Sequence, residues 1–116
     1  MAYDEDLADR IRELLSGAKA VTESKMFGGL AFLVGGNMAI AASGQGGILV
    51  RVDPDESDEL VSTTRAEPAV MRGRPMVGWL RVDAVDVRTR VQLKKWVTIG
   101  ERYARSLPVK TKNKKR

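Results

Sequence analysis

The stretch KMFGGLAFLVGGNMAIAASGQGGILVRV, residues 25–52, is a series of short apolar runs separated by clusters of glycine. Apolar runs of about five residues between glycine-rich breaks are typical of strands joined by tight turns. The stretch therefore predicts three consecutive strands, at residues 30–34, 38–42 and 48–52. Residues 21–27 are expected to form a strand before them or to lead into one, with a break or a bulge at the two adjacent glycines.

Side chains alternate between the two faces of a strand, so the sequence also predicts which residues share a face. Arg51 is expected on the same face as Leu49 and opposite Val50. Its charge must then reach the rim of the sheet or meet a carboxylate. In the preceding strand, the same alternation places Met38 beside Ile40.

Helical periodicity is present on both sides of these strands, and the expected helices cover residues 4–16, 54–63 and 84–107. Asp53 followed by Pro54 is a start signal for the second helix, because aspartate caps a helix and proline suits its first position. Asp83 or Asp86 is expected to cap the third helix. Its apolar arc contains Trp96, which we expect to face the sheet.

The order of these elements predicts the class of fold. A second, weaker hairpin is expected after the middle helix, with its later strand at residues 77–82. The sequence thus predicts an α+β domain of two layers, an antiparallel sheet of about five strands with helices on one face, in the order α-β-β-β-α-β-β-α. We expect one domain over residues 1–109 and a disordered basic tail over residues 110–116.

The composition excludes several classes of chemistry. The chain has no cysteine and no histidine, so disulfides, thiolate or imidazole zinc sites and His-based acid–base catalysis are excluded. No spacing makes a nucleophile and a base neighbours, and we expect neither an enzyme nor a cofactor. The acidic run at residues 53–59 is interpreted as a helix cap and a solvated helix face rather than a metal site.

Residues 26–50 contain no charged residue, but their glycines divide them into pieces too short to cross a membrane. The amino terminus, MAYDEDLADR, is acidic and lacks the features of a signal peptide. We therefore expect a cytoplasmic protein without membrane contact.

The formal net charge of +5 has a single source. The last seven residues, KTKNKKR, carry five basic groups, and removing these leaves 15 basic residues against 15 acidic ones. Basic residues also gather on one arc of the last helix and could neutralise phosphates in a nucleic acid. The candidates for such contact are Arg88, Arg90, Lys94, Lys95, Arg102, Lys110, Lys112, Lys114 and Lys115. A solubilising surface, or a surface for an acidic protein partner, would give the same pattern.

Three short motifs occur in a fixed order along the glycine-rich stretch. The first is the run Met-Phe-Gly-Gly, and the second is Gly-x-Met at the start of the second strand. The third is a basic residue, a hydrophobic residue and an aspartate at the end of the third strand. The residues that carry these motifs are Met26, Phe27, Gly28, Gly29, Met38, Arg51 and Asp53. In this order the chain resembles the amino-terminal domain of the TfoX/Sxy family of competence regulators, over about residues 5–106. Arg51 stands where that family usually has lysine, which keeps the charge but changes the shape.

This resemblance implies an α+β unit of the secretion-chaperone-like type without established catalytic residues. Full-length members act as transcriptional co-activators with a cyclic-AMP-receptor-type activator and carry a second, helical carboxy-terminal domain. At 116 residues we expect a stand-alone form of the amino-terminal domain.

Two hypotheses of function follow. In the first, the chain is a regulatory adaptor, expected to be a homodimer, which binds a transcription factor or another protein through a sheet edge or the region of Trp79, Arg72 and Arg74. In the second, it binds DNA or RNA directly, with little sequence preference, through the basic residues named above. A chaperone-like module with an unrelated client is a third outcome.

Overall fold

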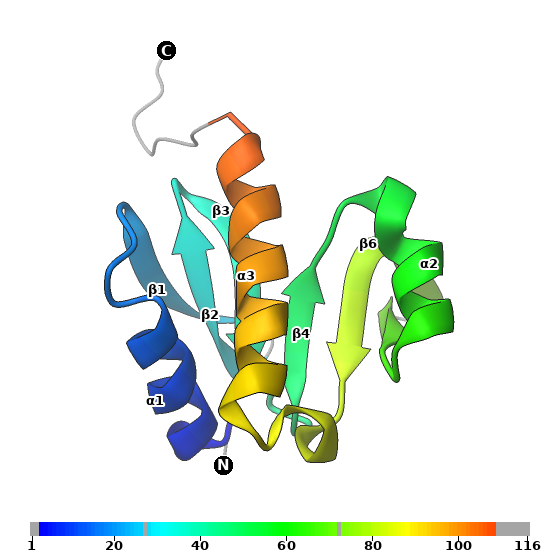
Figure 1. Cartoon of the computed structure of the whole chain (residues 1–116), viewed down its shortest axis with the longest axis horizontal. Coiled ribbons are helices and arrows are strands. Elements are labelled where there is room, and N and C mark those ends of the chain that lie inside the picture. The colour runs from blue at the N-terminus through cyan, green and yellow to red at the C-terminus, as the bar shows by residue number, and fades with distance from the viewer. Residues whose placement is uncertain (1–2, 27, 72, 109–116) are drawn as a thin grey trace.

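The computed structural model describes residues 3–26, 28–71 and 73–108, which form an antiparallel sheet and a layer of helices (Figure 1). In chain order the elements are α1 (Glu5–Leu14), β1 (Val21–Met26), β2 (Gly29–Val34), β3 (Asn37–Ala42), β4 (Ile48–Arg51), α2 (Pro54–Thr63), β5 (Glu67–Met71), β6 (Arg74–Val82), the short 3-10 helix η1 (Ala84–Val87) and α3 (Arg90–Ser106). The predicted domain boundary and the basic tail fall at the edge of the described residues and beyond it.

The sheet has the strand order β1-β2-β3-β4-β6-β5, and each neighbouring pair is antiparallel. The predicted α+β class is confirmed. The sheet has six strands rather than about five, because the first segment forms a full strand that pairs with β2 from Val21–Val34 to Met26–Gly29. The later hairpin is also longer than predicted, since β6 begins at Arg74.

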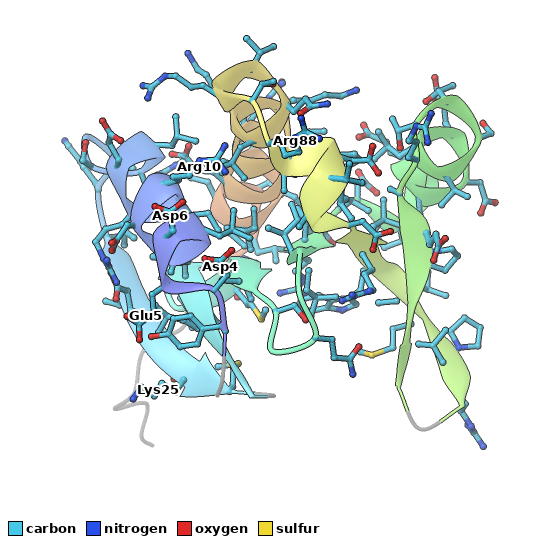
Figure 2. All side chains as sticks on the ribbon, turned by 90° about the horizontal axis from the view of Figure 1, so that it is seen from below. Asp4, Glu5, Asp6, Arg10, Lys25 and Arg88 are labelled. Carbon is cyan, nitrogen blue, oxygen red and sulfur yellow. The ribbon has the colours of Figure 1, made fainter. Side chains whose placement is uncertain are left out.

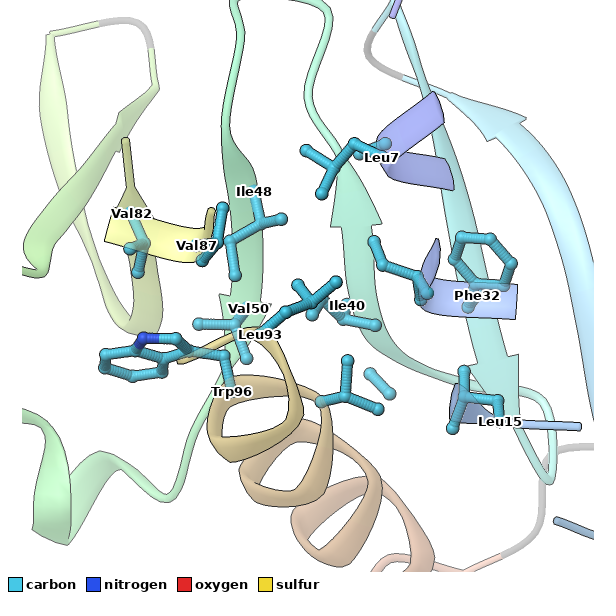
Figure 3. Close-up of a cluster of buried hydrophobic side chains, with 14 of the residues drawn as sticks. Leu7, Leu15, Phe32, Ile40, Ile48, Val50, Val82, Val87, Leu93 and Trp96 are labelled. Carbon is cyan, nitrogen blue, oxygen red and sulfur yellow. The ribbon is translucent and has the colours of Figure 1, made fainter. Parts of the chain in front are cut away.

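The hydrophobic core lies between the helices and one face of the sheet (Figure 3). α1 and α3 pack against the middle strands, and α2 packs against β6. Leu93 is fully buried and Trp96 is only 4% exposed, which confirms that the apolar arc of α3 faces the sheet. Gly100 allows α3 to approach closely, because a Cβ at this position would lie 2.5 Å from the backbone oxygen of Ala39.

The start of the last helix differs from the prediction. Neither Asp83 nor Asp86 caps it, and α3 begins at Arg90 with Thr89 as its cap. The Thr89 hydroxyl accepts a hydrogen bond from the Gln92 backbone N–H at 3.1 Å, and the Gln92 side chain accepts one from the Thr89 N–H at 3.0 Å. This reciprocal capping box satisfies two N–H groups at the helix start, so it determines the start of α3 after the separate turn η1.

The expected placement of Met38 beside Ile40 is wrong. β2 and β3 pair as Phe32–Ile40 and then Leu33–Met38, so the register shifts by one residue at this point. An extra residue in one strand reverses the alternation beyond it. Ile40 therefore lies in the core under the helices, while Met38 belongs to a cluster on the opposite face of the sheet.

Candidate functional site

One face of the sheet is left without a layer of helices by the part of the chain that the structure describes. We call it the open face. Seen from below, the hairpins β1–β2 and β5–β6 stand on either side of the β3–β4 turn, with the helices above (Figure 2). A separate apolar cluster lies on this face and consists of Met26, Ala31, Leu33, Met38, Ala41, Leu49 and Trp79. An apolar sheet face without a covering layer is a candidate interaction surface.

The open face is hollowed into a groove of about 540 Å³. Leu33, Met38, Leu49 and Trp79 line it from the centre of the sheet, and side chains from the β5–β6 hairpin line it from the side. Its volume falls in the range of roughly 300–1,000 Å³ that is typical of ligand sites. The groove is therefore large enough to enclose several side chains of a binding partner.

Gly78 bends β6 at the point where the hairpin leaves the main sheet. Its φ is +85°, a left-handed conformation that glycine adopts without strain. Its carbonyl accepts a hydrogen bond from the Val52 N–H at 2.8 Å. The pairing of β5 with β6 also shifts register between Pro68 and Val70. Beyond this bend, Ala69, Val70 and Met76 form one side of the groove.

Methionine is prominent along the groove, which is lined by Met26, Met38 and Met76. Methionine has a flexible, unbranched and polarisable side chain, so it adapts to partners of different shape. Val70 is 63% exposed at the outer wall. This part of the lining is thus apolar and built from side chains that can adapt to a partner.

Arg51 lines the groove from the last position of β4, one residue beyond the pair Ile40–Val50 that joins β3 and β4. Its guanidinium carbon is 5.3 Å from the centre of the Trp79 ring and 5.6 Å from that of the Tyr103 ring, distances at which cation–π attraction operates. Among the described residues, no carboxylate pairs with it and no oxygen accepts a hydrogen bond from its side chain. The predicted charge on this face therefore meets aromatic rings rather than a carboxylate.

Arg81 supplies a second positive charge to the groove. Its guanidinium donates long hydrogen bonds to the Ser43 hydroxyl at 3.3 Å and to the Gln45 carbonyl at 3.2 Å. The carboxylate of Asp83, which is exposed, lies 4.0 Å away. Arg81 is thus held at the β3–β4 turn, and within the described part of the chain it forms no ion pair closer than 4.0 Å.

Several residues singled out from the sequence meet at this groove. Met26, Met38 and Arg51 of the family motif line it, and so does Trp79, the expected partner contact. They come from four different strands. Sequence reasoning missed Arg81, although its position two residues after Trp79 in the same strand is a signal that the two share a face.

The other predicted site residues have separate places. Gly28 lies in the β1–β2 turn and Gly29 begins β2. Asp53 caps α2, where its carboxylate accepts a backbone N–H at 2.9 Å. Arg74 is exposed at the start of β6 and does not line the groove. Two predicted residues, Phe27 and Arg72, lie outside the described residues.

The candidate nucleic-acid contacts lie on the other layer of the molecule. Those within the described residues are all exposed, namely Arg88, Arg90, Lys94, Lys95 and Arg102. Arg88 precedes α3, and the other four form what we call the basic ridge on its outer side. Lys110, Lys112, Lys114 and Lys115 lie outside the described residues.

Acidic helices flank the basic ridge. α3 lies between α1 and α2 (Figure 1). The exposed carboxylates of α1 are those of Glu5, Asp6, Asp9 and Glu13, and those of α2 are Asp55, Glu56, Asp58 and Glu59. These carboxylates repel the phosphates of a nucleic acid that approaches the ridge, which reduces the attraction of the ridge for a nucleic acid.

An ion pair on the covered side ties α1 to β1. The Arg12 guanidinium donates hydrogen bonds to both oxygens of Glu23, at 2.6 and 2.9 Å. These bonds lower the pKa of the Glu23 carboxyl and raise the pKa of Arg12. The pair belongs to the covered side, whereas the groove lies on the opposite face of the same sheet, and it acts as a local link between two elements.

Two kinds of feature are absent from the described ranges. Over residues 3–26, 28–71 and 73–108, no group of three or more acidic side chains is arranged to hold a metal ion. Within the same ranges, no helix has the length and apolar character that crossing a membrane requires.

The fold and the groove define a small α+β domain whose helices cover one face of an antiparallel sheet while the other face carries an apolar groove with two arginines. The family model described as TfoX N-terminal domain matches residues 13–103, and the chain belongs to this family. No curated protein and no solved structure matches the chain. The family suggests a role related to competence or its regulation, and it is not known as enzymatic.

Proposed function

We propose that the protein is a non-enzymatic regulatory adaptor that acts by binding another protein at the groove of the open face. The observation that carries this proposal is the uncovered apolar cluster around Leu49 and Trp79, hollowed into a groove of about 540 Å³. Tryptophan and arginine are enriched at the energetic centres of protein interfaces, and both line this groove. The regulatory role suggested by the family also requires a partner.

A capture experiment with three forms of the full chain tests the proposal. Wild type, Leu49→Asp and Lys94→Gln are immobilised and exposed to lysate of the native host, with and without nuclease, and the bound proteins are quantified by mass spectrometry. Leu49→Asp and Lys94→Gln change the net charge equally, but only the first alters the groove. We expect at least one protein that wild type and Lys94→Gln retain equally, that nuclease does not release, and that Leu49→Asp retains at least tenfold less. Purified and remixed, this protein should reproduce the pattern.

Two other results would overturn the proposal. Retention that is equal for all three forms would assign binding to a surface other than the groove. Retention that nuclease abolishes, or that Lys94→Gln weakens, would favour the basic ridge.

Direct binding of a nucleic acid through the basic ridge is the alternative function. The exposure of Lys94, Lys95 and Arg102 on one side of α3 supports it, and the acidic flanks of α1 and α2 oppose it. A gel-shift titration of the full chain at low and high salt, with Lys94→Glu/Lys95→Glu as the variant, separates the two functions. Phosphate contacts predict binding that salt weakens and that the variant loses; the adaptor proposal predicts no shift.

A further inference from the structure

Resting on the proposed function, the geometry points to the chemistry of the partner. We propose that the groove binds an apolar segment of a partner protein that carries a carboxylate, and that this carboxylate pairs with Arg51. The apolar side chains of the segment would pack on Leu49 and Trp79.

Arg51 is a partly buried cation whose hydrogen-bond donors meet no acceptor among the residues that the structure describes. The aromatic rings of Trp79 and Tyr103 lie near its guanidinium. Such rings attract the positive charge, but they do not replace an oxygen as hydrogen-bond acceptor for the N–H groups. Among the described residues no oxygen takes that role. A guanidinium that packing already holds in place loses little conformational entropy when it forms the two parallel hydrogen bonds of an arginine–carboxylate pair.

The groove offers positive charge on an apolar background. Leu49 is opposite Arg81, and Arg51 is opposite Trp79, across the same pair of strands. Two cations and two apolar side chains therefore alternate in a square patch on one face. None of the described residues that line the groove is acidic. A ligand that is apolar and negatively charged complements this patch, whereas a basic or neutral polar segment leaves the charges unpaired.

A second copy of this chain fits the groove poorly. Pairing two open faces would bring Arg51 and Arg81 of one copy toward the same cations of the other, and none of the described residues that line the groove is a carboxylate that could separate them. Glu67 is opposite Arg81 across β5 and β6, but it is exposed and does not line the groove. The carboxylates of the chain are concentrated on α1 and α2, whose apolar side chains, such as Leu7, Ile11 and Leu60, pack against its own core. These helices therefore expose their carboxylates while most of their apolar side chains are buried or partly buried in the core.

Selection of peptides on the full chain tests the inference. A random peptide display library is selected on immobilised wild type, and the dissociation constants of the enriched peptides are measured by fluorescence anisotropy. We expect peptides that combine large apolar residues with aspartate or glutamate. Arg51→Gln should weaken their binding about 10–100-fold, the effect of losing a charge-assisted hydrogen bond. Lys94→Gln, the matched loss of one charge on the other layer, should leave binding unchanged.

Reversing the charge at position 51 gives a second, independent test of the pairing between Arg51 and a carboxylate of the partner. Selection on Arg51→Glu should enrich lysine and arginine in place of acidic residues, while the apolar residues stay. Circular dichroism of each variant verifies that the fold is kept. Leu49→Asp, which places a carboxylate inside the groove, should weaken the acidic peptides at least tenfold.

The outcomes separate the two proposals. One outcome is a set of peptides whose binding is weakened by Leu49→Asp, but which show no acidic bias and bind Arg51→Gln as well as wild type. This outcome would overturn the proposed chemistry of the partner and leave the adaptor function standing. If no peptide is obtained whose binding is weakened by Leu49→Asp, the result would count against both the partner chemistry and the adaptor function. A dimer of the wild type in sedimentation that Leu49→Asp dissociates would make a second copy the occupant and would also overturn the inference.

Discussion

The two faces of the sheet are made by the same strands but from different kinds of side chain. The face under the helices presents large aromatic and branched residues that are fully buried, among them Phe32, Ile40, Ile48, Val50 and Leu80. The open face presents small residues, methionines, a tryptophan and two arginines. Branched and aromatic side chains have few rotamers and fix a core, whereas the unbranched side chain of methionine adapts to its surroundings. The covered face therefore accounts for stability, and the open face is the surface we propose for binding.

Neighbouring residues of β4 allow the sharpest test of this difference. Val50 is fully buried on the covered face, and Leu49 is partly exposed on the open face. Val50→Asp would bury a carboxylate without a partner, which costs several kcal/mol out of a total stability of about 5–15 kcal/mol, so we expect the variant not to fold. Leu49→Asp keeps contact with water and with two arginines and should cost only about 1–2 kcal/mol.

Circular dichroism and urea unfolding of both variants measure the difference. Equal losses of stability would mean that the open face is as well covered in solution as the other, and the contrast between the faces would fail. Such a result would itself indicate a bound layer, whether from another chain or from a second copy.

A smaller effect is expected at the contact between α3 and the covered face. A Cβ added at Gly100 would lie 2.5 Å from the Ala39 oxygen and 3.1 Å from a methyl group of Val50. Gly100→Ala gains about 1 kcal/mol of helix propensity but forces the helix away from the sheet, at a cost of about 1–3 kcal/mol. We expect a net loss of stability in urea unfolding.

Gly17→Ala is the matched control, because nothing lies within 4 Å of a Cβ at that position. Its backbone does not require glycine, so this change should raise the free energy of unfolding by about 0.4–1 kcal/mol, because alanine lowers the conformational entropy of the unfolded chain. Two substitutions of the same kind should thus have opposite signs. A stabilising effect of Gly100→Ala would show that α3 does not approach β3 as closely as described.

The contrast between the faces was partly predictable from the sequence. Alternation along β4 correctly separates Leu49 and Arg51, which line the groove, from Val50 in the core, because a strand without bulges has a strict period of two. The same rule fails for Met38, since the register shift between β2 and β3 depends on pairing that is not local in the sequence. The cap at Thr89 was missed because two nearby aspartates are equally good caps on local grounds.

The groove itself could not be predicted. Its outer side depends on the bend at Gly78, and one glycine within an apolar strand is consistent with several backbone conformations. The aromatic neighbours of Arg51 come from β6 and α3, which are far from it along the chain. Sequence periodicity thus assigns residues to a face, but tertiary packing decides which of them meet.

The smallest expected effect concerns the Arg12–Glu23 pair at the rim of the covered face, where the Arg12 guanidinium also lies 5.9 Å from the centre of the Phe32 ring. The hydrogen bonds from Arg12 lower the pKa of Glu23 below its usual value of 4.5. A carboxyl whose pKa is lowered by folding contributes stability above its unfolded pKa and loses it as the pH falls through the folded pKa.

Glu23→Gln should therefore lower the thermal midpoint slightly at pH 7 and have no effect well below pH 4.5. The difference is small because both partners are partly exposed and water screens exposed ion pairs. Added salt should reduce it further. Thermal unfolding of wild type and variant across this pH range measures it. A difference that grows as the pH falls would contradict the sign of the shift and would mean that the link between α1 and β1 is not ionic. Peptide binding to the groove should be the same in both proteins at every pH, since the pair belongs to the face that we assign to stability alone.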